Sequence, residues 1–266
     1  MSSGPGLGRD VTPYAALARF PDRTRPLLTH YSGADQRVEL SVASVANAVA
    51  KAAGLLRDGL GLAPSEATVS IDLPRHWQLP VWTMAALSVG ARVGRHLPGQ
   101  VEVRVIGPGI ASVGEPGPDG QVDVEGVRRR AADDVLLSGC DPFGLPVPAL
   151  VRAEVEASLG GPVIDVGIEA RAQPDVFTPE PGAGEAGELV GTDGSTVPWA
   201  EAALAHASGR TDGARLWIDE RTHESGLLVL SALVPLVLTG SVVIGSGLTA
   251  EQAEHVRAVE RVSRAG

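Results

Sequence analysis

The chain has 266 residues, a hydrophobic fraction of 44% and a formal net charge of −10, a composition typical of a soluble globular protein with one large domain or two small ones. The acidic balance argues against a general nucleic-acid binder, which needs a basic face to displace counterions. Cys140 is the only cysteine, so no intrachain disulfide can form and nothing indicates an oxidising compartment.

The first residues carry no signal-peptide pattern, because no basic segment is followed by an apolar one. We therefore expect residues 1–24 to form a flexible or short helical leader, and we expect a cytoplasmic protein. Residues 25–32 and 36–40 then predict two short strands around a Gly-Ala-Asp turn.

A regular helical pattern follows in residues 41–61, where apolar residues recur on one face. Ser41 suits the N-cap, and Gly59 or Gly61 suits the end of the helix. Residues 67–74 predict a strand, 77–91 a helix that ends at Gly90, and 91–95 another strand. Alternating strands and helices predict a parallel sheet covered by helices.

The middle of the chain predicts strands at 101–107 and 134–139, with a short helix at 125–134 between them. The basic run 128–130 is interpreted as a solvated helix face. Proline and glycine are dense in 178–188, which predicts a surface loop and an internal boundary near 172–187. The G-x-G-x-x-G pattern in 182–187 lies in this loop, so we interpret it as a plain loop rather than a dinucleotide fingerprint.

Residues 225–248 form an uncharged stretch that is long enough for a membrane span. Pro235 and Gly240 interrupt this stretch, so we favour a buried helix followed by a buried strand and expect no membrane association. A terminal amphipathic helix capped by Thr249 is predicted after it.

The segment 189–207 predicts a strand, a small polar loop and a helix, an order that suits phosphate binding. Its loop contains two glycines and three hydroxyl residues, but it also carries Asp193 and no cation, and Trp199 stands where a cation would help. The candidate phosphate-binding residues are Gly191, Thr192, Asp193, Gly194, Ser195 and Thr196.

Two other constellations are interpreted more simply. Cys140 has Asp141 beside it, which would raise the thiol pKa, so we expect a buried or half-buried small residue. Residues 218–226 gather carboxylates with His223, but their spacing matches no strong ligand motif, so a polar loop is favoured over a metal site. No G-x-S-x-G elbow is present.

Three segments, taken in order, carry a family resemblance: residues 38–93, the polar loop, and residues 222–247 with His223 and Gly226 in an H-x-x-G pattern. They resemble the N-terminal part of the adenylate-forming enzymes, the AMP-binding acyl-CoA synthetases and ligases. In the loop, either residues 191–194 match the centre of the family's T-S-G-T-T-G-x-P-K loop or Pro198 matches its proline. The matching positions of the first segment are Asn47, Gly59, Leu73, Pro74, Trp82, Ala85, Gly90 and Ala91.

This resemblance implies an α/β fold, a mainly parallel sheet with helices on both faces, similar to the first part of an adenylate-forming N-terminal domain. It implies one domain over residues 25–266, ATP or AMP at the loop, and a substrate pocket at His223 and Gly226. The chain also resembles a group of short stand-alone relatives of these enzymes in high-GC bacteria.

The sequence departs from the family's pattern in its cations and its later motifs. Lys51 is the only lysine and lies in the first amphipathic helix, so neither family lysine has a counterpart. The adenylate-binding motifs that follow the third segment, and the small C-terminal domain, have no counterpart either. We therefore expect a non-catalytic homologue that binds a nucleotide or acyl ligand weakly. The alternatives are a divergent ligase completed by a partner chain, and a structural module that binds a protein partner or forms a homo-oligomer.

Overall fold

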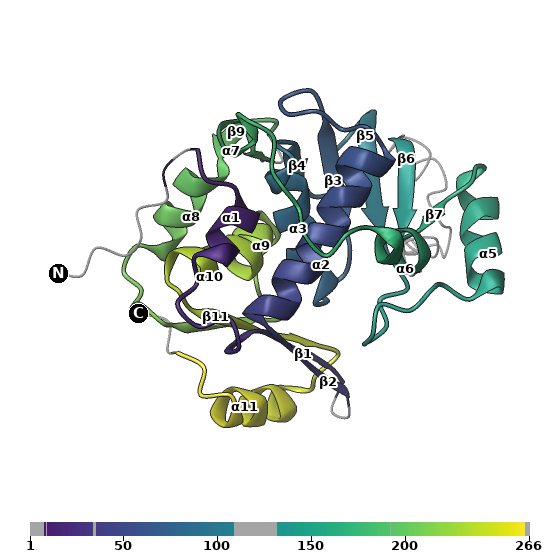
Figure 1. The fold of residues 1–266 in the computed structure, drawn as a ribbon. Helices are drawn as coiled ribbons and strands as arrows, with labels where there is room; N and C mark the ends of the chain where they lie inside the picture. Colours follow the sequence, from purple (N-terminus) through teal and green to yellow (C-terminus); the bar gives the residue numbers. More distant parts are fainter. Residues whose placement is uncertain (1–7, 9, 34–35, 109–131, 192, 264–266) are drawn as a thin grey trace.

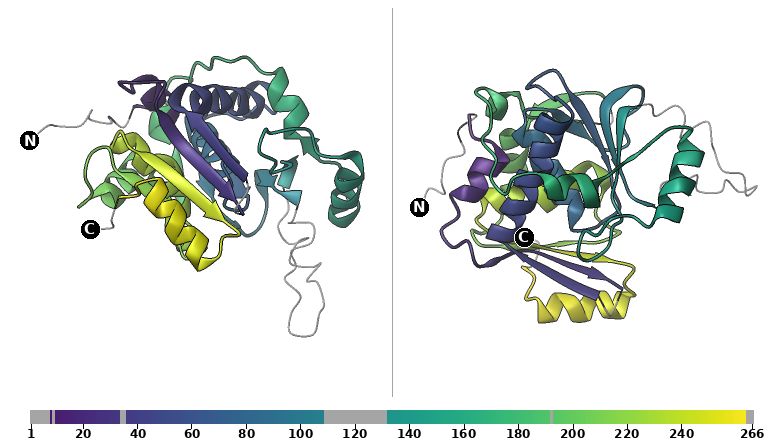
Figure 2. Two further views of the ribbon diagram at one scale, coloured as in Figure 1. Left: turned by 90° about the horizontal axis from the view of Figure 1, so that it is seen from below. Right: turned by 45° about the vertical axis from the view of Figure 1, so that its right-hand side comes forward.

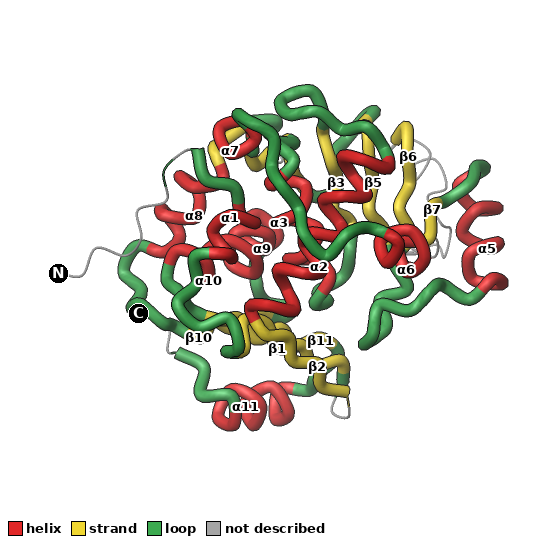
Figure 3. The backbone as a smooth tube through the Cα atoms, in the orientation of Figure 1, coloured by secondary structure: helices red, strands yellow, loops and turns green. Residues whose placement is uncertain are grey.

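A computed structural model describes residues 8, 10–33, 36–108, 132–191 and 193–263. Its strands form two sheets, which helices separate (Figure 3). The smaller sheet has the order β10-β11-β1-β2 and the larger the order β7-β6-β5-β3-β4-β8-β9. The expected mainly parallel α/β architecture is confirmed, but it is divided between two sheets rather than contained in one.

The smaller sheet joins the beginning of the chain to its end. The antiparallel hairpin of β1 (Pro26–Ser32) and β2 (Gln36–Ser41) is the one predicted from the sequence. β1 also pairs in parallel with β11 (Ser241–Ser246), which pairs with β10 (Arg215–Ile218). The helix α11 (Ala250–Val259) lies against the outer face of this sheet (Figures 1 and 2) and begins with the predicted Thr249 cap.

The larger sheet is parallel except for its last strand, β9 (Thr196–Pro198). Its other strands are β3 (Thr68–Asp72), β4 (Arg92–Gly94), β5 (Val101–Ile106), β6 (Ala132–Leu137), β7 (Ile164–Asp165) and β8 (Glu188–Val190). The basic run 128–130 and most of the predicted helix at 125–134 lie outside the described residues. The last three residues of that predicted helix, 132–134, belong to β6, so the helix prediction is wrong there.

Helices fill the space between the sheets. α2 (Val42–Gly54) begins after the predicted N-cap Ser41, whose side chain accepts a hydrogen bond from Ser44 N, and it continues into a π-helical turn, Leu55–Gly59. α3 (Gln78–Ser88) is buried on every side and contacts both α1 (Pro13–Ala18) and α2. One hydrophobic cluster includes side chains from both sheets and these helices.

Further α-helices in the described residues are α5 (Ala149–Leu159), α6 (Val166–Glu169), α7 (Ala183–Ala186), α8 (Trp199–Ala207), α9 (Glu224–Leu228) and α10 (Val234–Val237). The uncharged stretch 225–248 is α9, a π-helical turn, α10 and β11 in succession. Among the helices in the described part of the chain, none is long and apolar enough to cross a bilayer.

Two predicted boundaries are packed segments. The short helix of the leader, α1, buries Leu17 and is followed by buried Phe20. Near the expected boundary, Phe177 is buried, and Lys51 on α2 pairs with Asp175 at 2.7 Å. The turn at 183–186 is helical and partly buried, so the prediction of a plain surface loop is wrong there.

Candidate functional site at the carboxyl edge of the larger sheet

The carboxyl ends of β3, β4 and β5 lie at one edge of the larger sheet. β3 pairs with β4 on one side and with β5 on the other. The connection from β4 to β5 therefore passes from one side of β3 to the other, and the direction in which strands are added to the sheet reverses there. Such a reversal of strand order opens a crevice at the carboxyl edge, where α/β proteins commonly bind ligands. The segments that leave β3 and β4 at this edge carry Arg75 and Arg95.

Arg75 and Arg95 share one carboxylate. Arg75 Nη2 is 2.7 Å from Glu224 Oε1, and Arg95 Nε is 2.8 Å from Glu224 Oε2. The two arginine side chains are 18% and 9% exposed, whereas that of Glu224 is 45% exposed. This cluster of two guanidiniums and one carboxylate, the Arg75–Glu224–Arg95 cluster, therefore carries one net positive charge in a largely desolvated place.

The electrostatics of the cluster favour an anion. Burial lowers the pKa of Arg95, although Glu224 and Asp72 oppose this effect. Partial burial works to raise the pKa of Glu224, but the nearby Arg95 and Arg75 outweigh it and lower that pKa. Arg75 Nε is buried and has no hydrogen-bond partner among the residues that the structure describes. An anion with several oxygens would satisfy such a donor.

A buried polar network fixes the edge beneath the cluster. Asp72 is 2% exposed, pairs with buried Arg104, and accepts a 2.6 Å hydrogen bond from the backbone nitrogen of His96. His96 adopts a left-handed backbone conformation with φ 50°. Arg95 donates from Nη1 to the carbonyl of Leu73 at 2.8 Å, so its position is set by both β3 and β4.

The predicted phosphate loop is the turn of a β-hairpin. β8 and β9 pair in antiparallel register, and Gly191 N donates to Ser195 O at 2.8 Å. Gly194, with φ 80°, takes a conformation that favours glycine. Thr192 lies outside the described residues.

The sequence suggested that this loop leads directly into a helix, and that interpretation is wrong. β9 intervenes, and α8 begins at Trp199 after Pro198. Trp199 is buried in the core, 1% exposed, and so does not occupy a cation position in the loop.

Asp193 folds back on the loop. Its Oδ1 accepts hydrogen bonds from Ser195 N at 3.0 Å and Ser195 Oγ at 2.6 Å, and these bonds lower its pKa. An anion at this loop would compete with the Asp193 carboxylate for the same donors. Nucleotide binding by Gly191, Asp193, Gly194, Ser195 and Thr196 stays a prediction.

The structure brings the loop and the cluster to the same edge. β4 and β8 are parallel neighbours, with Val93 opposite Leu189. Gly191 therefore leaves β8 beside the point where Arg95 leaves β4. The cation missing from the loop sequence stands on the adjacent strand end. Sequence reasoning missed Arg95, although its position at the end of a predicted strand was a usable signal.

His223 and Gly226 flank Glu224 at the start of α9. His223 is the N-cap, and its Nδ1 accepts a hydrogen bond from Ser225 N at 3.3 Å. Gly226 is buried, and a Cβ there would lie 3.3 Å from Leu230. The structure thus places both residues next to the cluster, while their role as a substrate pocket stays a prediction.

The other candidate positions have structural roles. Burial raises the pKa of the half-buried Cys140 thiol to about 11, and Asp141 adds to this effect. Asp219 accepts from Trp217 Nε1 at 2.8 Å, and Glu220 accepts from Gly247 N at 3.0 Å. In the described parts of the chain, no group of three His, Cys, Asp or Glu side chains could hold a metal ion.

Comparison with solved structures identifies the class of fold. Brucella canis acyl-CoA synthetase superimposes on 95% of this chain with a TM-score of 0.65 and 17% identity. The amide bond synthetase McbA from Marinactinospora thermotolerans covers 95% with a TM-score of 0.58 and 15% identity. The chain spans 46% and 47% of these two enzymes. It therefore has the fold of part of an adenylate-forming enzyme, as the sequence resemblance implied.

A curated relative is similar in sequence over a shorter range. A Mycobacterium tuberculosis protein, named only as a member of a numbered family, is 31% identical over 132 residues. The match covers 48% of this chain and 49% of the relative, so the two chains are nearly equal in length. No family model matches the chain.

Proposed function

We propose that this protein is a non-catalytic homologue of the AMP-binding ligases, and that it binds the phosphate of a nucleotide such as AMP or ATP at the Arg75–Glu224–Arg95 cluster. The observation that carries the proposal is the position of Arg95. It is nearly buried, it follows the strand beside the glycine loop, and a partly exposed carboxylate is its anionic partner.

A phosphate fits this cluster chemically. Arginine donates to phosphate in the same forked geometry that it uses for a carboxylate. A bound phosphate would replace Glu224 at one or both guanidiniums and satisfy the orphan Arg75 Nε. The hydroxyls and backbone N–H groups of the 191–196 loop would supply further donors once Asp193 turns away.

The cations that adenylation uses are not supplied by the single lysine. Lys51 Nζ is 2.7 Å from Asp175 Oδ1 and donates to the carbonyl of Gln173 at 2.8 Å. Transfer of a phosphoryl-linked group develops negative charge that positioned cations must stabilise. One net positive charge at the cluster supports binding of an anion better than it supports that chemistry.

The test is calorimetric titration with AMP, ATP and an acyl-adenylate analogue. Arg95→Gln should weaken AMP binding roughly tenfold or more, equivalent to about 1.4 kcal/mol. Arg92→Gln is the matched control, because Arg92 is exposed at the opposite end of the same strand and the change in net charge is equal. Absence of binding at about 5 mM nucleotide, near the weakest affinity that titration detects, would refute the proposal. An equal loss in both variants would also refute it.

A further inference from the structure

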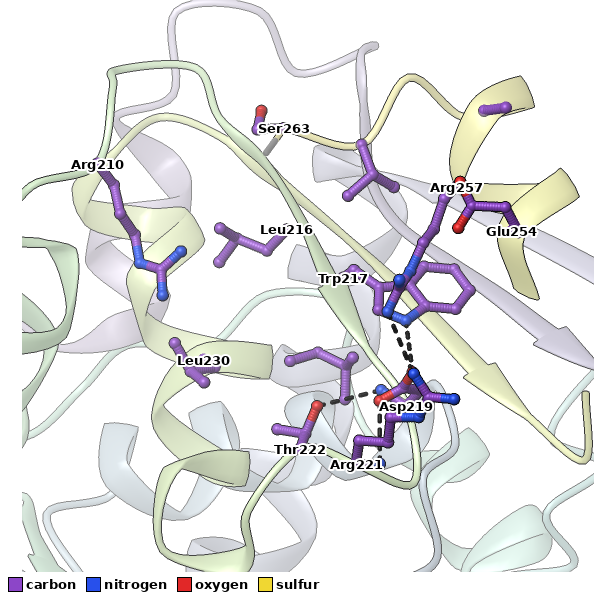
Figure 4. A pocket seen from close by; sticks show the side chains of 13 residues that line it. Arg210, Leu216, Trp217, Asp219, Arg221, Thr222, Leu230, Glu254, Arg257 and Ser263 are labelled. Atoms are coloured by element: carbon purple, nitrogen blue, oxygen red, sulfur yellow. Dashed lines mark hydrogen bonds and ion pairs between the residues drawn. The ribbon is translucent and has the colours of Figure 1, made fainter. Parts of the chain in front are cut away.

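A pocket of about 650 Å³ runs along the outer edge of β10 (Figure 4). β10 is an edge strand of the smaller sheet, and the pocket lies between it, the π-helical turn at Val229–Leu233 and α11. Its apolar lining residues include Leu216, Ile218, Leu230, Ala258 and Val262. Its size is within the usual range of small-molecule sites.

The edge of β10 leaves one residue unpaired. At Arg215 the edge is covered, since Arg215 N donates to Ser263 Oγ and Arg215 O accepts from Ser263 N, both at 2.9 Å. At Asp219 it is covered again, since Asp219 N donates to Thr222 Oγ1 at 3.1 Å and Asp219 O accepts from Thr222 N. Trp217 lies midway between them.

Strand alternation turns the backbone of Trp217 toward the pocket. Successive residues of a strand direct their N–H and C=O groups to opposite edges, so residues 215, 217 and 219 share the outer one. Within the described chain, the N–H and C=O of Trp217 have no hydrogen-bond partner. An unpaired donor and acceptor on an edge strand can pair with the N–H and C=O of one residue of an added chain.

Three guanidinium groups line the same pocket. Arg257 lies 5.0 Å from the ring centroid of Trp217, and its buried Nε has no partner among the described residues. Arg210 and Arg221 also line the pocket. Its acidic groups are Asp219, which already pairs with Arg257, and Glu254. The lining thus carries one net positive charge on a chain whose net charge is −10.

We propose that this pocket is a second binding site, for a short ligand with a secondary amide next to a carboxylate. The amide N–H would donate to the carbonyl of Trp217, and one carboxylate oxygen would accept from Trp217 N, as in a paired strand residue. The other carboxylate oxygen would bind Arg257 or Arg221, and an apolar side chain would lie on Leu216 and Leu230. Because Ser263 and Thr222 close the edge on both sides, only one residue of a chain can pair there. The site is independent of the nucleotide site proposed above.

The probe is N-acetyl-leucine, followed by tryptophan fluorescence and calorimetry. We expect binding with a dissociation constant on the order of 1 mM. N-methylation of the amide, or replacement of the carboxylate by a carboxamide, should each weaken binding roughly tenfold. Equal binding of all three compounds, or none by N-acetyl-leucine at about 10 mM, would overturn the proposal. Both comparisons use the unmodified protein.

Val262→Trp should fill the pocket and abolish binding of the probe, whereas Val259→Trp, at an exposed position of α11, should not. Unchanged probe binding in folded Val262→Trp would overturn the proposal. A longer peptide that ends in leucine distinguishes the two sources of this chemistry. Equal affinity would assign the site to small N-acyl amino acids, and a tenfold gain would assign it to peptide C-termini. AMP binding should be unchanged by Val262→Trp, so the two proposals fail separately.

Discussion

Glu224 occupies the place that a ligand anion would take. Its carboxylate bridges two arginines whose side chains are mostly withdrawn from water, and it is itself nearly half exposed. An internal carboxylate of this kind neutralises the arginines in the free protein and must yield when an external anion binds. The affinity of the cluster for phosphate is therefore set by competition between the two anions.

Glu224→Gln should raise the affinity for AMP roughly tenfold, because the arginines lose their internal counter-charge. The same change should lower the free energy of unfolding at neutral pH, since two partly buried cations are left unpaired. Calorimetry and urea unfolding measure the two effects. Glu66→Gln, at an exposed residue near the amino end of β3, is the control. Weaker AMP binding in Glu224→Gln would show that Glu224 belongs to the ligand site itself.

Two histidines meet in the interior between the sheets. His30 on β1 and His76 after β3 are 2% and 5% exposed, and their rings stack edge to face at 4.6 Å between centroids. Burial lowers the pKa of His30 to about 4. Burial, with the neighbouring His30, lowers that of His76 to about 3. Both rings are therefore neutral at physiological pH.

Stability should fall as the pH drops below 6.5, the ordinary histidine pKa, because the unfolded chain then takes up protons that the folded chain excludes. For His30 the full effect is on the order of 3 kcal/mol. Urea unfolding between pH 6.5 and 4.5 isolates this window from most carboxylate titration. His76→Asn should reduce the slope, because Asn can accept the bond from Gln78 N without titrating. His255→Asn, at an exposed site, should not reduce it.

Individual elements were predictable where their pattern is local. The helix at 41–61, the hairpin before it and the strand at 67–74 each carry a cap, a turn or a periodic apolar face, and all are present. α5 was not predicted, because it lies in a proline-rich stretch, has no side-chain cap and buries Val155 alone. The hairpin strand β9 is three residues long, which is too short for a period to appear.

Gly184, in the α7 helical turn, packs against the backbone of Asp10, which is distant in the sequence. A local sequence pattern does not predict such a contact. A Cβ on Gly184 would lie 2.3 Å from the carbonyl oxygen of Asp10, so only glycine permits this close approach of two backbones. Gly184→Ala should lower the free energy of unfolding by about 1–3 kcal/mol through overpacking. Thermal unfolding measures the loss. Gly161→Ala is the control, because a Cβ there would have no heavy atom within 4 Å and the φ of Gly161 is not positive. Equal stability of the two variants would contradict the argument.

At the scale of the whole molecule, the sequence predicted the layers but not their assembly. β1 pairs with β11 although more than 200 residues separate partners such as Leu28 and Val242. The pattern of an isolated strand does not specify such a partner, so the sequence predicted one sheet where the structure has two. The candidate site was likewise predictable only in part. The loop and the His223–Gly226 segment were found as motifs, whereas Arg75 and Arg95 join them only through the strand order.

The last prediction concerns catalysis and is tested by an ATP–pyrophosphate exchange assay across a panel of carboxylic acids. The chain alone should give no exchange above the blank, even under conditions where AMP binds. The cluster offers one net positive charge, and Lys51 is held by Asp175 and Gln173. Exchange by the chain alone would refute a non-catalytic role. Exchange that appears only when a second protein is added would instead favour a ligase whose charge-stabilising groups are divided between two chains. Loss of that exchange in Arg95→Gln but not in Arg92→Gln would place this chain's contribution at the cluster.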